Sequence, residues 1–308
     1  MLDVVVLGSA AGGGFPQWNS NAPACRRARS GDRSAVPRTQ ASIAVCGNGD
    51  DWFILNASPD LRVQIEATPA LHSREGLRSS PISGVLVPGG DVDAVAGLLH
   101  LRERHRFTVY APQRVHAVIA ANPIFSVLAE DCVGRVELPL DTRVELAGTN
   151  GPSGLAVVAF AVPSKIPLYL ETAGLDPGIS EEGDAVGLEI IGTGTGKSFF
   201  FIPGCAAITE PLRCRLGGGE LVFFDGTLWR DDEMIRLGAG TKTGRRMGHI
   251  SMSGEDGAIV AFRDLGVKRR IFIHINNSNP VLLADSAERR AAEEAGWEIA
   301  YDGMEVRL

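Results

Sequence analysis

The sequence has no paired cysteines, few histidines, few aromatic residues and no long apolar run. Its five cysteines are scattered and odd in number, and none forms a Cys-x-x-Cys pair. This pattern argues against a disulfide framework and favours reduced thiols. No apolar run approaches the roughly 18 to 20 residues that a membrane-spanning helix needs. The first residues lack the positive region of a signal peptide, so we expect a cytoplasmic protein without membrane attachment.

The chain also lacks an excess of positive charge. It carries 30 Lys and Arg against 37 Asp and Glu, a formal net charge of −7. Nucleic-acid binding needs clustered cations, so this balance argues against a nucleic-acid partner. The short basic run at 26–29 is typical of a solvated surface. With 308 residues and no linker or low-complexity break, we predict a single domain over 1–308.

Apolar runs bounded by turn residues alternate with helical patterns along the whole chain. We therefore predict an α/β fold built of layers, with strands dominating 135–204. The other predicted strands are 2–7, 41–45, 52–55, 84–87, 107–110, 221–224, 271–275, 297–301 and 304–308. The predicted helices are 94–104, 112–121, 123–129, 253–265 and 283–295.

An acidic loop, Pro88-Gly-Gly-Asp-Val-Asp93, follows the predicted strand 84–87. Asp91 and Asp93 could cap the next helix, or they could bind a hard or borderline cation. Metallo-β-lactamase-fold enzymes carry a His-x-His-x-Asp-His signature at this kind of junction. On that frame Gly89 and Asp91 take the first two His positions, Asp93 takes the Asp position, and Ala94 takes the last His position.

Two histidines lie in loops of the C-terminal half. His249 follows Met247-Gly248 and precedes a predicted helix, and His274 ends an apolar strand before an Asn-rich loop. A histidine at a strand end can be a metal ligand or an acid–base group. It can equally be a hydrogen-bonded core residue, and the sequence alone leaves both interpretations open.

Two further residues follow buried strands. Asp225 comes directly after Leu221-Val-Phe-Phe224, where it could reach a site at the sheet edge or simply form an Asp-Gly turn. Cys205 follows Phe199–Pro203, and we expect a buried inert thiol because nothing basic adjoins it in sequence. The glycine-rich segments 8–14 and 192–198 resemble phosphate loops, but neither has the required spacing and helix start, so we predict turns.

Many long strings, in order from end to end, make the sequence resemble the coenzyme PQQ synthesis protein B family of the metallo-β-lactamase superfamily. They are Leu7-Gly-Ser-Ala-Ala-Gly-Gly-Gly14, Pro16-Gln-Trp-Asn19, Pro37-Arg-Thr-Gln40, Leu55-Asn-Ala-Ser-Pro-Asp60, Arg74-Glu-Gly-Leu-Arg78, Gly90-Asp-Val-Asp93, Ala96-Gly-Leu-Leu99, Ile202-Pro-Gly-Cys-Ala206, Phe224-Asp-Gly-Thr227, Gly240-Thr-Lys-Thr-Gly244, Met247-Gly-His-Ile250, His274-Ile-Asn-Asn277 and Asn279-Pro280. The resemblance implies an αββα sandwich of two mixed sheets between helices.

The resemblance also implies a part in making pyrroloquinoline quinone, a redox cofactor built from linked Glu and Tyr side chains of a precursor peptide. The family has been regarded as an iron-dependent oxygenase that hydroxylates the tyrosine ring of the excised Glu–Tyr intermediate, and also as a carrier of the quinone or its precursor. By this resemblance Asp91, Asp93, His249 and His274 surround an iron (Fe2+) or zinc ion, with Asp225 nearby. Asp93, His249, His274 and Asp225 are then the catalytic candidates.

The sequence departs from the family pattern at two places. After Asn19 the family usually carries Cys-x-Cys-x-x-Cys, a thiolate set suited to structural zinc, whereas this chain has Ser20, Ala22 and Cys25. One thiolate cannot hold zinc, so we expect no structural metal at 20–25. Ala94 replaces the family's histidine after Asp93, and the loss of an imidazole should weaken or abolish metal binding at the main site.

Three hypotheses follow. The first is a metal-dependent oxidation of a tyrosine-derived dipeptide, and the second is a non-catalytic carrier of the quinone or its precursor with a decayed metal site. The third is a metallo-hydrolase, which the residues favour less, because that chemistry needs several histidines around a metal-activated water. Other proteins of the same pathway are possible partners.

Overall fold

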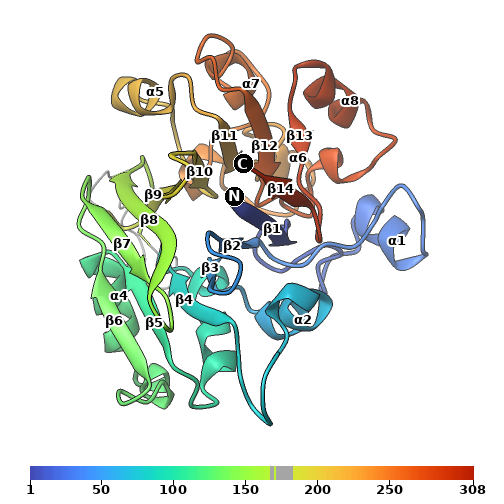
Figure 1. The fold of residues 1–308 in the computed structure, drawn as a ribbon. Coiled ribbons are helices and arrows are strands. Elements are labelled where there is room, and N and C mark those ends of the chain that lie inside the picture. The colour runs from blue at the N-terminus through green and yellow to red at the C-terminus, as the bar shows by residue number, and fades with distance from the viewer. Residues whose placement is uncertain (167–169, 171–182) are drawn as a thin grey trace.

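The computed structural model describes residues 1–166, 170 and 183–308, and it contains two seven-stranded sheets packed face to face (Figure 1). The first sheet has the strand order β14-β1-β2-β3-β4-β5-β6 and the second β13-β12-β11-β10-β9-β8-β7. The predicted αββα sandwich of the metallo-β-lactamase type is confirmed. The strands of the first sheet are β14 (Glu305–Arg307), β1 (Asp3–Gly8), β2 (Ser42–Cys46), β3 (Trp52–Leu55), β4 (Ile82–Leu86), β5 (Phe107–Ala111) and β6 (Val133–Glu137). Those of the second are β13 (Glu298–Ile299), β12 (Arg269–Ile273), β11 (Leu221–Asp225), β10 (Ser198–Ile202), β9 (Val186–Gly192), β8 (Pro152–Ala161) and β7 (Arg143–Ala147).

Helices cover the outer face of each sheet. The α-helices are α1 (Pro23–Arg29), α2 (Leu61–Ala67), α3 (Val92–Val95), α4 (Gln113–Ala121), α5 (Glu210–Leu216), α6 (Glu233–Arg236), α7 (Ala258–Ala261) and α8 (Ala287–Glu294). Short 3-10 helices span Pro69–Leu71, Ala96–Leu101, Pro123–Val127, Arg245–Met247 and Pro280–Leu282. In Figure 1, α5, α7 and α8 lie on one side of the molecule, and α2 and α4 lie on the other. No helix in the described parts of the chain is long and apolar enough to cross a bilayer.

Three apolar clusters hold these layers together. The central one fills the space between the sheets and includes Val4, Phe53, Phe201, Phe223 and Ile271, all at most 1% exposed. The other two lie between each sheet and its own helices. Apolar side chains on both faces of a strand produce continuous apolar runs, which is why the strands were recognisable in the sequence.

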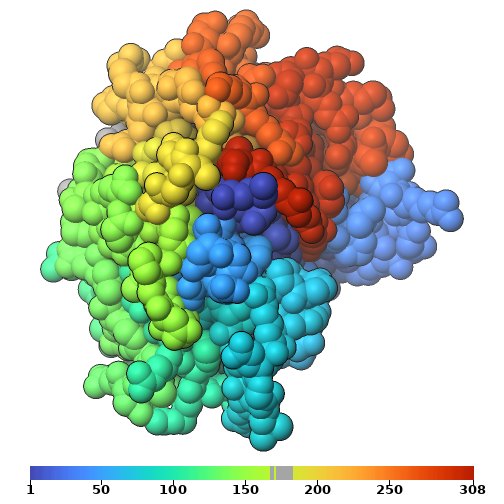
Figure 2. Space-filling model, in the orientation of Figure 1, coloured from blue at the N-terminus to red at the C-terminus, as the bar shows by residue number. Residues whose placement is uncertain are grey.

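The two chain ends meet at one edge of the first sheet. Strand β14 pairs antiparallel with β1, and Asp3 lies opposite Arg307 in the register. Figure 2 shows the blue N-terminal and red C-terminal residues side by side on this face. The last strand of the chain, β14, is therefore the edge strand of the sheet and pairs with the first strand, β1.

The parallel strands of each sheet bring the segments that follow them to the same edge of that sheet. Strands β3, β4, β5 and β6 run parallel, and so do β10, β11, β12 and β13. The carboxyl ends of neighbouring parallel strands meet at one sheet edge, where open α/β sheets bind their ligands. Asn56 follows β3, and the loop 87–91 and the helix α3 follow β4. In the other sheet Asp225 ends β11 and His274 directly follows β12.

Most predicted elements are present, with boundary shifts of a few residues, but three helices differ, one of them 123–129, where a 3-10 helix spans Pro123–Val127. The predicted helix 253–265 is wrong over most of its length, because Gly254 adopts φ +97° and the helix α7 runs only from Ala258 to Ala261. The predicted helix 94–104 is instead α3 followed by a 3-10 helix. There Gly97 donates its N–H to Ala57 O, and a Cβ on Gly97 would lie 2.2 Å from Ser58 O.

Other predictions of local structure are confirmed. The glycine-rich segment 192–198 is the turn between β9 and β10, and the segment 8–14 is a loop of turns after β1. Cys205 is buried, and its thiol donates to Ala207 O. Of the region predicted to be rich in strands, residues 167–169 and 171–182 lie outside the described residues.

The loop that precedes α1 is held by an arginine. Arg29 donates to the carbonyl oxygens of Ser20 (2.6 Å), Gln17 (2.5 Å) and Trp18 (3.4 Å). Cys25 is buried in α1, with its Sγ 3.5 Å from Asn277 Oδ1. Charged hydrogen bonds from one guanidinium to several carbonyls therefore fix the loop in which the family usually carries a thiolate set.

We predict that Arg29→Met lowers the free energy of unfolding by about 1 kcal/mol, because the lost hydrogen bonds are solvent-exposed. A change of that size shifts Tm by about 1.5 °C in a chain of 308 residues, because the unfolding entropy grows with chain length. Thermal unfolding followed by circular dichroism measures it, with Arg26→Met, an exposed arginine of the same helix, as the control. Equal melting temperatures for both variants would show that Arg29 does not hold the loop.

Candidate metal centre

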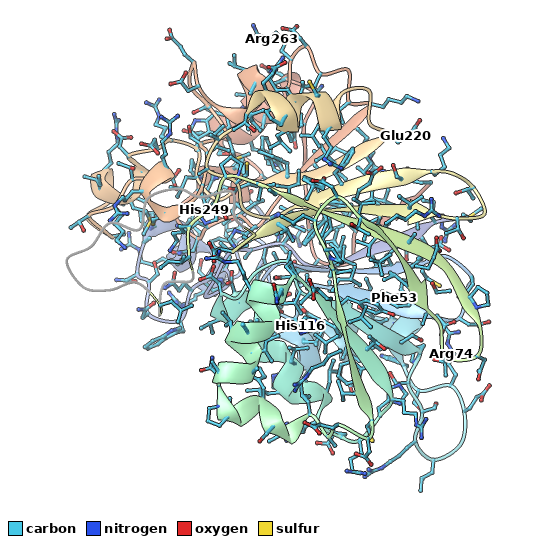
Figure 3. All side chains as sticks on the ribbon, turned by 90° about the vertical axis from the view of Figure 1, so that its left-hand side faces the viewer. Phe53, Arg74, His116, Glu220, His249 and Arg263 are labelled. Carbon is cyan, nitrogen blue, oxygen red and sulfur yellow. The ribbon has the colours of Figure 1, made fainter. Side chains whose placement is uncertain are left out.

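A cavity of about 940 Å³ opens at the carboxyl ends of the strands of both sheets. Its wall combines residues from the first sheet, including Asp91 and Asp93, with residues from the second, including His249 and His274. Figure 3 shows His249 between the layer that carries His116 and the layer that carries Glu220. Only folding brings these segments together, since Asp93 and His274 lie 181 positions apart.

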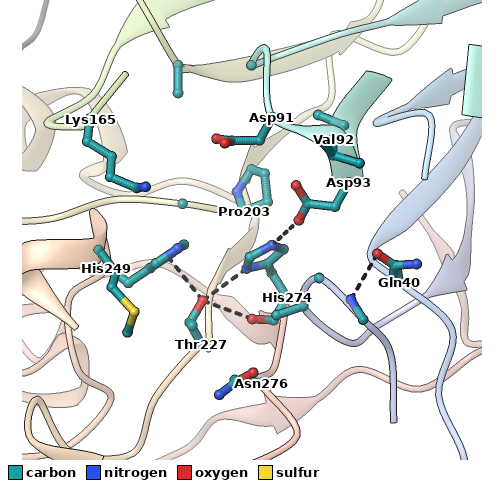
Figure 4. A pocket seen from close by; sticks show the side chains of 18 of the residues that line it. Gln40, Asp91, Val92, Asp93, Lys165, Pro203, Thr227, His249, His274 and Asn276 are labelled. Atoms are coloured by element: carbon teal, nitrogen blue, oxygen red, sulfur yellow. Dashed lines mark hydrogen bonds and ion pairs between the residues drawn. The ribbon is translucent and has the colours of Figure 1, made fainter. Parts of the chain in front are cut away.

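His274 and Asp93 form a pair across the two sheets. His274 Nε2 lies 2.9 Å from Asp93 Oδ2, and the two side chains are 12% and 22% exposed (Figure 4). Burial disfavours charge on both groups, but their hydrogen bond and mutual attraction outweigh it. The pKa of Asp93 is therefore lowered and that of His274 is raised from the usual ranges.

His274 holds an unusual backbone conformation, with φ +58°. Residues other than glycine seldom adopt this left-handed conformation, and such strain is concentrated at functional sites. It occurs immediately after β12, where the chain turns into the Asn-rich loop. This turn directs the imidazole into the cavity instead of along the strand.

A second network surrounds Asp225 and Thr227. Asp225 is fully buried, and its Oδ2 lies 2.8 Å from His249 Nδ1 and accepts the N–H of Cys205 at 3.0 Å. The hydroxyl of Thr227 lies 2.7 Å from Asp225 Oδ1, 2.9 Å from His274 Nδ1 and 3.1 Å from His249 Nδ1. The two imidazoles stack with 5.3 Å between their centroids.

The donor set suits a borderline metal ion. Asp225, His249 and His274 offer ligand atoms within 4.8 Å of one another, and Asp93 contacts His274 directly. Two imidazoles with carboxylates are ligands for zinc or Fe(II). The chemistry of these side chains therefore fits the metal that the resemblance implies.

The structure places every predicted site residue around the same cavity, but in different ways. Hydrogen bonds and ring stacking connect Asp93 to His274, His274 to His249 and His249 to Asp225, and Asp91 lies on the wall of the same cavity. Asp91 is the N-cap residue of α3, and its side chain makes no capping hydrogen bond. Figure 4 shows Asp91 and Lys165 on the wall beside the two histidines. Ala94, 7% exposed, also lines the wall and offers no ligand atom.

Two residues of the site had no role assigned from the sequence. Asn56 adopts φ +72°, and its Nδ2 donates to Ala41 O and to Asp93 O, so it joins the acidic segment to the residue that precedes β2. Thr227 connects Asp225 to both histidines. An Asn directly after a buried strand was a usable signal, because Asn tolerates left-handed backbone.

Close backbone approach also shapes the site. Gly204 packs on His249, since a Cβ there would lie 3.4 Å from its Cε1. Gly12 packs on Asp93, where a Cβ would lie 3.7 Å from Oδ2. Both distances are ordinary van der Waals contacts, so the backbone at 12 and 204 forms part of the wall around the carboxylate and the imidazole.

Comparison with known proteins identifies the family. Coenzyme PQQ synthesis protein B of Gluconacetobacter diazotrophicus is 60% identical over 308 residues, covering 99% of each chain. That of Bradyrhizobium diazoefficiens is 52% identical over 311 residues and covers both chains fully. The chain belongs to the coenzyme PQQ synthesis protein B family. A β-lactamase superfamily domain model also matches residues 51–275.

Solved structures agree with this assignment. The crystal structure of zinc-bound PqqB from Methylobacterium extorquens is 50% identical, with a TM-score of 0.94, and covers 99% of this chain and 100% of its own. A diphosphatase from the PhnP family has a TM-score of 0.68 at 18% identity over 99% of this chain and 96% of its own. At that identity the likeness concerns the fold alone. Family membership supports a part in PQQ synthesis.

We predict that Asp93→Asn lowers the stability of the metal-free protein in a pH-dependent way. The carboxylate's contribution is present above its unfolded pKa of 3.8 and is lost as pH falls through the lowered value. The contribution of His274 is fully present below 6.5 and is lost as pH rises through the raised value. The free energy of unfolding lost in Asp93→Asn is therefore largest between pH 3.8 and pH 6.5, and is about 2 kcal/mol at pH 5.

Urea unfolding at pH 5 and pH 9 in the presence of a chelator measures this difference. Asp264→Asn, at an exposed position, is the control and should change stability equally little at both values. An Asp93→Asn effect of the same size at pH 5 and pH 9 would contradict the coupling between Asp93 and His274.

Proposed function

We propose that this protein is a metal-dependent oxidising enzyme of PQQ synthesis that hydroxylates the tyrosine ring of a cross-linked Glu–Tyr intermediate. The observation that carries the proposal is the Asp93–His274 pair, with His249 stacked on it, at the wall of a cavity of about 940 Å³. Cavities of several hundred Å³ accommodate small-molecule substrates. Membership in the family supports the pathway, and the zinc-bound relative supports metal binding.

The cavity wall suits both ends of such a substrate. Val92, Pro203 and Met247 offer apolar surface on which a phenol ring can pack. Lys165 and Lys242 also line the cavity, and ammonium groups attract carboxylates, which a Glu–Tyr dipeptide carries. The amides of Gln40 and Asn276 add hydrogen-bonding groups between these regions.

Asp93 and His274 are the residues that would hold the metal, with His249 and Asp91 beside them. A bound Fe(II) would supply oxygen activation, since two His and one carboxylate is a common ligand set in iron oxygenases. Ring hydroxylation also consumes dioxygen, two electrons and two protons, so the reaction needs a reductant. Asp225 and Thr227 hold the imidazoles in place, and Asn56 fixes the backbone of Asp93.

One observation favours a second function, a non-catalytic carrier for the quinone or its precursor. Ala94 lines the cavity where the family pattern has an imidazole. A site with one ligand fewer binds metal more weakly, while the cavity could still hold the organic ligand. The carrier function predicts binding of the quinone by a metal-free protein.

Loading the protein anaerobically with Fe(II) and then adding oxygen, a reductant and the cross-linked dipeptide tests the enzyme function. We expect bound iron by elemental analysis and an oxygen-dependent hydroxylated product by mass spectrometry. His274→Ala should reduce turnover by about 100-fold or more, because it removes both a ligand and the partner of Asp93. His116→Ala, on α4 and hydrogen-bonded to Val136 O, is the matched control and should retain full turnover.

The outcome that favours the carrier is equally specific. It is binding of less than about a tenth of an equivalent of iron or zinc by the wild type, together with restored binding in Ala94→His. Tight quinone binding by that metal-free wild type would then show that the protein is a carrier and not the proposed enzyme.

A further inference from the structure

We propose that Thr227 is a positioning residue that sets the proton position on both site histidines, so that each directs Nε2 to the metal. The inference rests on the metal-dependent function proposed above. It places the metal on the Asp93 side of His274. Thr227 then acts on the imidazoles without contacting the metal.

The hydrogen bonds around Asp225 fix the direction of donation. Its Oδ1 accepts the backbone N–H of Thr227 at 3.0 Å, and its Oδ2 accepts that of Cys205 at 3.0 Å. Both oxygens are therefore acceptors. His249 Nδ1, 2.8 Å from Oδ2, must carry a hydrogen to bond there.

The single proton of the Thr227 hydroxyl then has one preferred destination. The hydroxyl lies 2.7 Å from Asp225 Oδ1 and 3.0 Å from the carbonyl oxygen of His274. A carboxylate is the stronger acceptor, so the hydroxyl donates to Asp225. Its oxygen can then only accept, and His274 Nδ1 at 2.9 Å must be the donor.

This arrangement leaves an unprotonated Nε2 on neutral His274, facing Asp93 Oδ2 at 2.9 Å. Two lone pairs face each other there, and only a proton or a cation between them makes the contact favourable. A metal ion held by Nε2 and the carboxylate satisfies both. Metal-binding histidines commonly donate their other ring N–H to such a partner, which fixes the tautomer and the ring orientation.

The side of the imidazoles that faces away from Asp93 is occupied by the Thr227 hydroxyl. The ligand atoms of Asp225, His249 and His274 cluster within 4.8 Å, but the Thr227 hydroxyl lies within 3.1 Å of all three groups. A cation at that position would have to displace the hydroxyl. The geometry therefore favours Thr227 and Asp225 as orienting groups behind the rings.

Zinc binding by variants at position 227 tests the role of the hydroxyl. Thr227→Val keeps the shape and removes the hydroxyl, and we expect 10- to 100-fold weaker zinc affinity in competition with a chromophoric chelator. Thr227→Ser restores the hydroxyl and should stay within about threefold of the wild type. Thr68→Val removes another buried hydroxyl, one that donates to Gln64 O at 2.8 Å, and should leave zinc affinity unchanged.

Nitrogen-15 NMR of the histidine rings gives a readout that does not depend on any variant at position 227. In zinc-loaded wild type, with His274→Gln used only for assignment, His274 should carry hydrogen on Nδ1 and metal on Nε2. Metal on Nδ1 of His274, or equal zinc affinity in Thr227→Val and wild type, would overturn the inference. If the Val variant does not fold, the wild-type spectrum decides alone.

The same measurements separate this inference from the proposed function. If the wild type binds zinc and Thr227→Val binds it with the same affinity, the role of Thr227 is contradicted, while the proposed metal-dependent function stands. Wild type that binds neither zinc nor Fe(II) contradicts the metal-dependent function and this inference with it.

Discussion

The contact between His274 Nε2 and Asp93 Oδ2, 2.9 Å long, joins the two halves of the site. His274 follows β12 of the second sheet, and Asp93 lies in the first turn of α3, which follows β4 of the first sheet. The position of each group depends on the register of parallel strands and on the packed core between the sheets. The contact therefore forms only when the whole sandwich has folded.

Around this contact, each site residue is held by a hydrogen-bonded partner. Asn56 binds the carbonyl of Asp93, Asp225 binds His249, and Thr227 binds both Asp225 and His274. These partners limit the movement of the side chains that line the cavity. The resulting preorganisation is what metal sites require, because the ligands must not rearrange each time the ion binds.

Sequence patterns were sufficient for the layered fold because its central strands, such as β2, β3 and β11, are buried on both faces and are continuous apolar runs. They also located the chain segments at the carboxyl ends of β4, β11 and β12, where the site residues Asp91, Asp93, Asp225 and His274 lie. The predicted helix 253–265 was wrong, because Gly254 has a left-handed backbone conformation and the helix begins only at Ala258. The role of Thr227 could not be predicted, because it depends on three side chains that meet only in three dimensions.

The central claim is that a metal ion lies between Asp93 and Nε2 of His274, despite alanine at position 94. Anomalous diffraction from crystals of the zinc-loaded protein tests it most directly, since it locates the ion without assuming its ligands. We predict a zinc peak within bonding distance of Asp93 and of His274 Nε2. A peak at the Thr227 side of the imidazoles, or none near either residue, would contradict the account.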